Sequence, residues 1–158
     1  MLLYQSPFSI TSSYTIHGTK KFNATPVIAP QAATVTRLSL LGYRQGTGEP
    51  LIRMELRAGG GSSPGIVLTQ SEDRDGSTMP TDGSWADFEV TPYLWATDQR
   101  YWIGTWANGS SGTNLQRHYY GPWTDPDGRR IRYSPNGVSW TADFAGRGML
   151  VQAWGFPV

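Results

Sequence analysis

The sequence predicts an all-β fold, a sandwich or barrel of short antiparallel strands with little or no helix. Short apolar runs recur along the 158 residues, and turn-forming residues separate them, as is typical of sandwiches and barrels. The 19 glycines and 11 prolines are scattered between these runs and do not gather in a linker, which indicates one domain. No window repeats apolar residues at the helical period over three turns.

The first thirty residues have the weakest strand pattern. Tyr14–Ile16 and Phe22–Ala24 are candidates for edge strands. Pro26 and Pro30 limit further pairing here, because proline has no backbone N–H to donate to a neighbouring strand.

The remaining predicted strands alternate apolar and polar residues or form short apolar runs between turn signals. They are Thr34–Leu41, Leu51–Arg57, Ile66–Ser71, Trp85–Val90, Ile131–Tyr133, Val138–Thr141 and Met149–Phe156. In the first of these, Thr36 is expected to face the core. The second has the clearest alternation, with its apolar residues inward and its charged residues outward. The last is expected to pair near the middle of a sheet.

The connections between these strands differ in kind. Glu72–Gly83 is predicted to be a long polar loop, and Thr91–Gln99 a crossing segment that can hold a turn of helix. Asn136-Gly137 is a strong short-range hairpin signal between the two strands that flank it.

Residues 101–123, YWIGTWANGSSGTNLQRHYYGPW, concentrate large aromatic side chains and are predicted to form two strands around a turn-rich connection. Alternation puts Tyr101 and Ile103 on one face, expected in the core, and Trp102 and Trp106 on the other. That second face is either covered by another layer or a loop, or is a platform for a sugar, a ring or a partner protein. The candidate binding residues are Trp102, Trp106, Asn108, Asn114, Tyr119, Tyr120 and Trp123.

The composition excludes several chemistries. Cysteine is absent, so disulfides, thiolate metal sites and thiol nucleophiles are excluded. A net charge of +1 is too small to attract nucleic acid electrostatically. No apolar stretch is long enough to insert in a membrane. His17 and His118 are the two histidines, and neither has a serine partner in a nucleophile-elbow setting. We therefore expect no catalytic residues, no enzymatic activity and no organic cofactor.

Two loops carry the pattern Asp-x-Asp-Gly, one beginning at Asp73 and the other at Asp125. Oxygen ligands on alternate residues before a glycine begin many calcium-binding loops. Asp73, Asp75, Asp125 and Asp127 are therefore weak candidates for a structural calcium ion. Ordinary Asx-turns explain both loops at least as well.

Several pieces follow a recognisable order from about residue 29 to the end of the chain. They are Ala29-Pro30 with Thr34-Val35-Thr36, Ile52–Leu56, Ser63-Pro64-Gly65 with Val67-Leu68, Trp85–Val90, Tyr101-Trp102-Ile103, Tyr133–Trp140 and Leu150–Gly155. This order resembles a family of small sandwiches often described as choice-of-anchor domains. The resemblance implies an antiparallel jelly-roll β-sandwich of about eight to ten short strands at 29–158. Residues 1–28 would precede it as an N-terminal arm or edge strands.

The resemblance implies a binding or assembly module, because such sandwiches display loops and share no catalytic residues. Similar modules occur in phage tail and virion proteins and in carbohydrate-binding modules. The N-terminus lacks the basic start and the long apolar run of a secretory signal, which agrees with a virion part made in the host cytoplasm.

The leading hypothesis is a non-enzymatic bacteriophage virion protein, either a capsid decoration (cement) protein or a minor tail protein. It would be present in multiple copies or as a homo-oligomer, beside other virion proteins. The alternative is a lectin-like carbohydrate-binding module that recognises surface glycans through its aromatic face.

Overall fold

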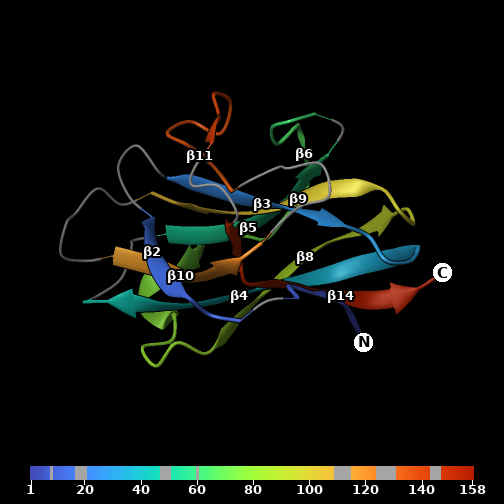
Figure 1. Cartoon of the computed structure of the whole chain (residues 1–158). Coiled ribbons are helices and arrows are strands. Elements are labelled where there is room, and N and C mark those ends of the chain that lie inside the picture. The colour runs from blue at the N-terminus through green and yellow to red at the C-terminus, as the bar shows by residue number, and fades with distance from the viewer. Residues whose placement is uncertain are drawn as a thin grey trace.

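The computed structural model describes residues 1–7, 9–16, 21–46, 51–59, 61–108, 115–123, 131–142 and 147–158. Within these ranges the chain forms two antiparallel sheets that pack face to face (Figure 1). One 3-10 turn is present at Gly76–Thr78, and the described residues form no α-helix and no helix that could cross a membrane. The prediction of an all-β antiparallel sandwich with little helix is confirmed.

The first sheet contains β1 (Leu2–Gln5), β2 (Ser12–Ile16), β4 (Ala33–Gln45), β8 (Trp85–Trp95), β10 (Leu115–Pro122), β13 (Arg147–Met149) and β14 (Val151–Pro157). The long strand β4 pairs with β8 along one edge, and with β14 and then β10 along the other. Strands β1 and β2 continue the sheet outward, β1 on β14 and β2 on β10. Because β14 lies between β1 and β4, the expectation that the last strand pairs inside a sheet is confirmed.

The second sheet contains β3 (Phe22–Ile28), β5 (Leu51–Ala58), β6 (Val67–Gln70), β7 (Arg74–Asp75), β9 (Arg100–Ala107), β11 (Arg132–Ser134) and β12 (Thr141–Ala142). Its order is β12-β11-β3-β9-β5-β6, with β7 also on β5. The described strands therefore number fourteen, more than the roughly eight to ten that the resemblance implies. Several of the additional strands are short pieces at sheet edges, which single-sequence alternation does not reveal.

The prediction that Phe22–Ala24 is an edge strand is wrong. These residues pair with β9 on one side and with β11 on the other. The three residues of β11 reach only this part of β3, so Pro26 lies where β9 is the one described strand partner. There a missing N–H removes no ladder hydrogen bond from a second neighbour.

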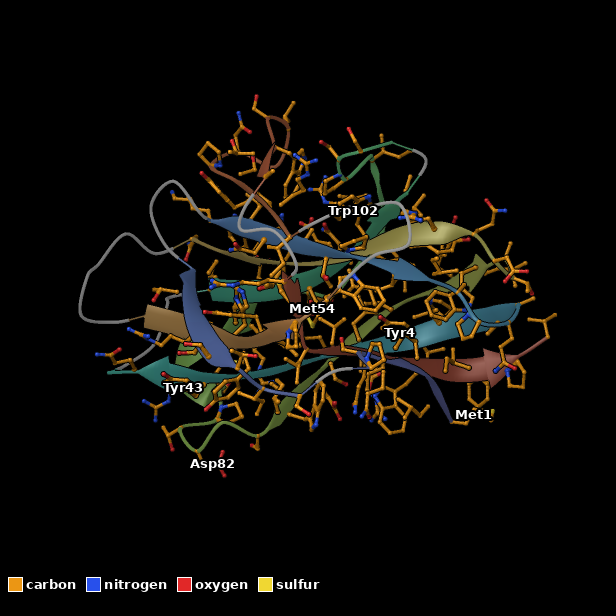
Figure 2. The ribbon with its side chains drawn as sticks, viewed as in Figure 1. Met1, Tyr4, Tyr43, Met54, Asp82 and Trp102 are labelled. Carbon is orange, nitrogen blue, oxygen red and sulfur yellow. The ribbon has the colours of Figure 1, made fainter. Side chains whose placement is uncertain are left out.

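The core lies between the two sheets, and Figure 2 shows Met54 of β5 at its centre. Ile52, Met54 and Leu56 are all fully buried, which confirms the predicted alternation of that strand. The inward position of Thr36 is wrong, because Val35 is buried there instead. The pairing of β4 with β8 shifts register between Val35 and Arg37, and such a β-bulge changes which residues face inward.

Three predicted connections are corrected or refined by the structure. Thr91–Gln99 holds no turn of helix at its start, because β8 continues to Trp95 and buries that side chain. The polar loop 72–83 contains β7 and the 3-10 turn. The pairing of β11 with β12 confirms a hairpin around Asn136-Gly137, but the predicted strand Val138–Thr141 is wrong before its last residue, because β12 begins at Thr141.

Candidate functional site

The two tryptophans of β9 face away from the core, on the outer face of the second sheet. Trp102 lies in register between Pro26 and Arg57 and is 0% exposed. Trp106 is half-buried, and the guanidinium carbon of Arg53 lies 4.3 Å from its ring centroid. Other parts of the chain therefore cover Trp102, and of these two tryptophans only Trp106 reaches the surface.

A row of ion pairs on β5 occupies the same outer face. The Oε1 atom of Glu55 lies 3.0 Å from Nε of Arg53, and its Oε2 atom lies 2.7 Å from Nε of Arg57. Glu55 and Arg57 are 1% and 7% exposed. Arg57 Nη1 also donates to the carbonyl oxygens of Gly65 at 3.0 Å and Gly137 at 3.2 Å. These bonds fasten two loops over the outward-facing charges of β5.

Aromatic rings surround the arginines of this row. The guanidinium carbon of Arg57 lies 5.2 Å from the Trp140 ring and 5.9 Å from the Phe22 ring. Phe22 packs edge-on against Trp140 at a centroid distance of 6.3 Å and also contacts Trp106 at 6.2 Å. Cation–π contacts of this kind are worth most where water is excluded. Trp140 and Phe22 are absent from the sequence-derived set of binding residues, since strand alternation alone does not show that a hairpin loop folds back onto the sheet.

The predicted residues of β10 belong to the opposite side of the sandwich. Tyr119 faces outward from the first sheet, with its ring 5.5 Å from that of Tyr43. Tyr120 faces the core, and the guanidinium carbon of Arg147 lies 4.6 Å from its ring. Trp123 follows the strand and is half-buried. Figure 2 shows Tyr43 and Trp102 on opposite sides of the molecule, so the structure does not bring these aromatic groups into one site.

Of the two asparagines predicted to bind a ligand, the structure describes only Asn108. The Oδ1 atom of Asn108 accepts a hydrogen bond from the backbone N–H of Leu51 at 3.0 Å, and its own N–H donates to the Leu51 carbonyl at 3.2 Å. Asn108 therefore ties the end of β9 to the start of β5. Asn114 lies outside the described residues.

A second set of polar and aromatic groups crosses the outer face of the first sheet. The Oε1 atom of Gln5 accepts from Gln152 at 2.8 Å, and the Oε1 atom of Gln152 accepts from Trp154 Nε1 at 3.1 Å. Arg37 lies 4.5 Å from the Trp154 ring centroid and makes a 3.1 Å ion pair with Asp87. This row, which we call the polar ladder, joins β1, β14, β4 and β8. The sequence did not show it because its members come from four separate segments.

The same sheet ends in a group of exposed apolar side chains. Leu94 of β8 and Phe156 of β14 both lie opposite Thr34 of β4, so alternation puts them on one face. Both chain ends lie at this end of the sheet (Figure 1), where the Met1 ammonium donates to the Gly155 carbonyl at 2.7 Å. Five side chains there are exposed by 38% to 82%. This terminal patch consists of Met1, Leu2, Leu94, Phe156 and Val158.

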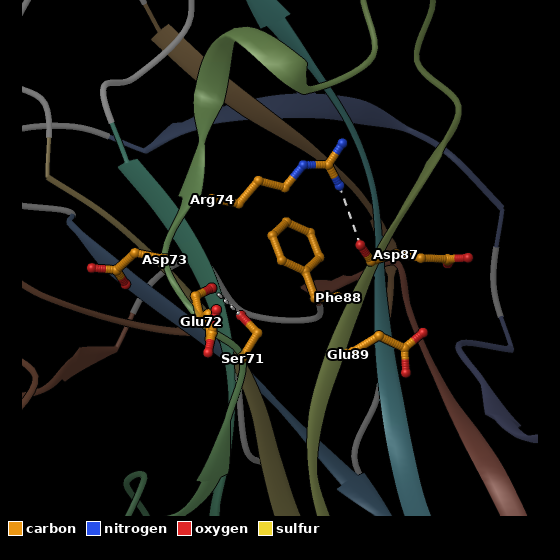
Figure 3. A pocket seen from close by; sticks show the side chains of 7 residues that line it. All are labelled: Ser71, Glu72, Asp73, Arg74, Asp87, Phe88 and Glu89. Carbon is orange, nitrogen blue, oxygen red and sulfur yellow. Dashed lines mark hydrogen bonds between the residues drawn. The ribbon is translucent and has the colours of Figure 1, made fainter.

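A groove of about 360 Å³ lies beside β8, where the chain from Ser71 to Arg74 approaches it (Figure 3). Its lining includes the carboxylates Glu72, Asp73, Asp87 and Glu89. Arg74 crosses this groove: Nη1 donates to the Asp87 carbonyl at 3.2 Å, and the guanidinium carbon lies 5.4 Å from the Phe88 ring. A cation of the chain itself therefore occupies the centre of this acidic lining.

The calcium candidates that the structure describes have partners within the chain. Asp73 forms an ion pair with Arg53 at 3.2 Å. Asp75 accepts a hydrogen bond from the Ser77 N–H at 2.8 Å, which lowers the pKa of Asp75 below its ordinary value. Asp125 and Asp127 lie outside the described residues. The described part of the chain contains no group of three or more His, Asp or Glu side chains placed to hold a metal ion.

His118 lies in the interior and is 0% exposed. Burial lowers its pKa to about 3, because the charged imidazolium loses its hydration there. The side chain is therefore neutral at neutral pH and is part of the packed interior. His17 lies outside the described residues.

The described residues thus present two outer faces of different character. One combines the polar ladder with the terminal patch, and the other carries loops fastened over a row of ion pairs. No protein-family model matches the sequence, and no curated protein matches it. The proposed function therefore rests on these two outer faces.

Proposed function

We propose that the protein is a non-enzymatic assembly module that docks on a larger particle through the outer face of its first sheet. The particle would be a bacteriophage virion, with the protein acting as a capsid decoration protein or a minor tail protein. The terminal patch carries this proposal, because Leu94, Phe156 and Val158 are each more than half exposed at 61%, 65% and 82%. Contiguous exposed apolar groups with a polar surround mark surfaces that a partner covers.

The outer face of the first sheet has the size that an interface needs. It is formed by seven strands, of which β4 is 13 residues long. At about 3.3 Å per residue along a strand and about 4.8 Å between strands, the seven strands together give a face of roughly 800 Å². A specific protein interface buries about 800 Å² on each partner.

The polar ladder would allow this face to recognise one partner in one orientation. Arg37 and Asp87 are paired on the surface, with side chains 30% and 49% exposed. Gln5, Gln152 and Trp154 are already held by hydrogen bonds to one another. Because these side chains are ordered before docking, little rotamer entropy is lost on association. Their fixed charges and dipoles would set the orientation of the partner.

We also propose that the sandwich has jelly-roll connectivity and that β1 and β2, at the start of the chain, act as a docking arm or as edge strands. Strands β1 and β2 support the edge role, since each pairs with one described strand, β14 or β10. Their opposite edges carry no strand in the described part of the chain. An open strand edge is a place where a strand of a neighbouring subunit can add.

Particle incorporation tests the docking proposal. Gradient-purified particles should contain the protein in a fixed copy number, and the double variant Leu94→Asp/Phe156→Asp should remain in the soluble fraction. The matched control is Ile66→Asp/Val138→Asp, which changes two exposed apolar residues on the loops of the second sheet and should be incorporated normally. Absence of the unaltered protein from particles, or equal incorporation of both double variants, would contradict the proposal.

Carbohydrate recognition is the second candidate function. The observation that favours it lies over the second sheet, where Trp140 and Arg57 line a groove between two loops. A half-buried tryptophan beside hydrogen-bond donors is a surface on which a sugar ring can stack. The groove lies over the outer face that the sequence predicted as a platform, but Trp140 lines it in place of Trp102, which is fully buried.

A further inference from the structure

The groove over the second sheet has a volume of about 360 Å³, which lies within the range of small-ligand sites. Pro64 and Ile66 line it from the loop before β6, and Val138 and Trp140 line it from the loop after β11. Both loops project from the same side of the sandwich in Figure 1 (top). Arg57 of β5 lies between them and completes the lining.

Arg57 is a buried cation with donor capacity left over. Its Nε bonds Glu55 and its Nη1 bonds the carbonyls of Gly65 and Gly137. No hydrogen bond from the described residues engages Nη2. A guanidinium carries five N–H donors, so the Nη2 group retains two for a ligand in the groove. At 7% exposure such donors are worth more than they would be in water.

The lack of a side chain at Gly137 avoids crowding of the Nη2 group. Its backbone has a positive φ of 74°, and a Cβ added there would lie 3.2 Å from Arg57 Nη2. Asn136 and Ser134 hold this turn, because Ser134 Oγ accepts from the Gly137 N–H at 2.9 Å and Asn136 Oδ1 accepts from the Val138 N–H at 3.0 Å. The loop is thus held in a shape that leaves space beside the guanidinium.

The charge beneath the groove favours an anion of single charge. Arg53, Glu55 and Arg57 form one row in which two cations share one carboxylate, so the row has a net charge of +1. Asp73 contacts the far arginine, Arg53, and its side chain is 40% exposed. Solvent therefore screens the charge of Asp73 more than that of the buried members of the row.

The walls of the groove suit a ring with an apolar face. Ile66 and Val138 are 74% and 79% exposed, and the Trp140 ring lies 5.2 Å from the Arg57 guanidinium carbon. A sugar ring that stacks on an aromatic face can also reach a nearby cation with a carboxylate on that ring. A phosphate group carries more charge than this single row would balance.

We propose that this groove binds an acidic sugar, a residue that carries one carboxylate such as a uronic acid. The ring packs against Trp140 between Ile66 and Val138, and the carboxylate accepts hydrogen bonds from Arg57 Nη2. This inference rests on carbohydrate recognition, the second candidate function, and is independent of docking through the first sheet. It adds the class of sugar and the residue that selects it.

Titration calorimetry with two forms of one ligand tests the proposal. The probes are oligogalacturonate with free carboxylates and the same oligomer with its carboxylates methyl-esterified. The free acid should bind, and the ester should bind at least about tenfold more weakly, since a charge-assisted hydrogen bond becomes a neutral one. Trp140→Ala should weaken binding of the free acid by at least about tenfold as well. Trp154→Ala, a matched change on the opposite sheet, should leave it unchanged.

Two substitutions of opposite charge at one exposed position test the role of charge without disturbing the fold. Arg57 supports two loops, so its removal would disturb the groove itself, whereas Val138 is exposed. Val138→Asp should weaken binding of the free acid, and Val138→Lys should preserve or strengthen it. Both changes should alter binding of the uncharged ester to the same extent, because each removes the apolar contact of Val138.

The remaining outcomes overturn the acidic-sugar assignment in distinguishable ways. Equal binding of acid and ester, lost in Trp140→Ala, would retain carbohydrate recognition and remove selectivity for the acid. Binding of a glutamate-rich peptide without binding of oligogalacturonate would identify a protein partner instead. Failure of oligogalacturonate, its methyl ester and the glutamate-rich peptide to bind would remove the groove as a site for acidic ligands, and particle incorporation would be unaffected.

Discussion

Glu55 accepts a 2.7 Å hydrogen bond from Arg57 on the outer face of the second sheet, and the two residues are 1% and 7% exposed. A charged pair on an outward-facing strand is ordinarily solvated. Here two loops cover it, because Arg57 Nη1 also bonds the carbonyls of Gly65 and Gly137. The pair therefore links the sheet to the loops that line the groove.

Replacement of Glu55 by glutamine should destabilise the fold strongly. The change keeps the shape of the side chain, but it leaves two neighbouring arginines, one of them buried, without their shared carboxylate. Removal of one partner of a buried ion pair costs about 3–5 kcal/mol. We expect Glu55→Gln to lower the free energy of unfolding by about 3 kcal/mol in urea denaturation followed by tryptophan fluorescence.

The polar ladder supplies the matched control for this prediction. Asp87→Asn removes a carboxylate from the pair with Arg37, whose side chain is 30% exposed beside an Asp87 side chain that is 49% exposed. Solvent screens such a pair, so the loss should be below about 1 kcal/mol. A loss for Glu55→Gln as small as that for Asp87→Asn would show that the buried pair does not anchor the loops.

Much of the fold could be predicted from local patterns. The alternation of Leu51–Arg57 predicted which residues face the core, and Met54 is fully buried as expected. Local patterns failed where pairing with a distant strand decides the outcome. The bulge of β4 against β8 puts Val35 in the core in place of Thr36, and the pairing of β11 makes Phe22–Ala24 an inner segment.

The candidate sites were harder to predict, because they are assembled across segments. Alternation correctly separated Trp102 from Tyr101 and Ile103, and only the tertiary structure shows that Trp102 is fully buried. The groove needs Arg57 from a strand and Trp140 from a hairpin loop far along the chain. One signal was available: Asn136-Gly137 indicated a tight turn a few residues before Trp140.

The buried His118 should make stability depend on pH. Its pKa is lowered from 6.5 to about 3 by burial, so between these values the unfolded chain binds a proton that the folded chain does not. The stability that this group contributes is present above pH 6.5 and is lost as the pH falls toward 3. The free energy of unfolding should decrease by about 2 kcal/mol between pH 7.5 and pH 5. Denaturation curves across this range measure the slope.

The slope of the unfolding free energy against pH shows whether His118 causes the pH dependence. The absolute stability of a variant does not. His118→Gln should flatten the dependence between pH 7.5 and pH 5, even if the variant is less stable throughout. His17→Gln removes the other histidine of the chain and is the comparison variant for His118→Gln. The pKa values of Asp75 and Asp82 are lowered from 3.8. These carboxylates therefore become protonated below the range from pH 7.5 to pH 5 and do not contribute to the slope there. An unchanged slope in His118→Gln would contradict the assignment.

Gly83 and Tyr119 should show strong energetic coupling. Gly83 has a φ of 77°, and a Cβ added to it would lie 2.5 Å from the Tyr119 hydroxyl oxygen. Gly83→Ala therefore combines left-handed backbone strain of about 1–2 kcal/mol with a clash against the tyrosine ring. In a Tyr119→Ala background the clash disappears and the strain alone remains. A double-mutant cycle measured by urea unfolding should give a coupling energy of at least about 1 kcal/mol, whereas independent sites add within about 0.5 kcal/mol. Additive losses would show that the segment carrying Gly83 does not pack on Tyr119 in solution.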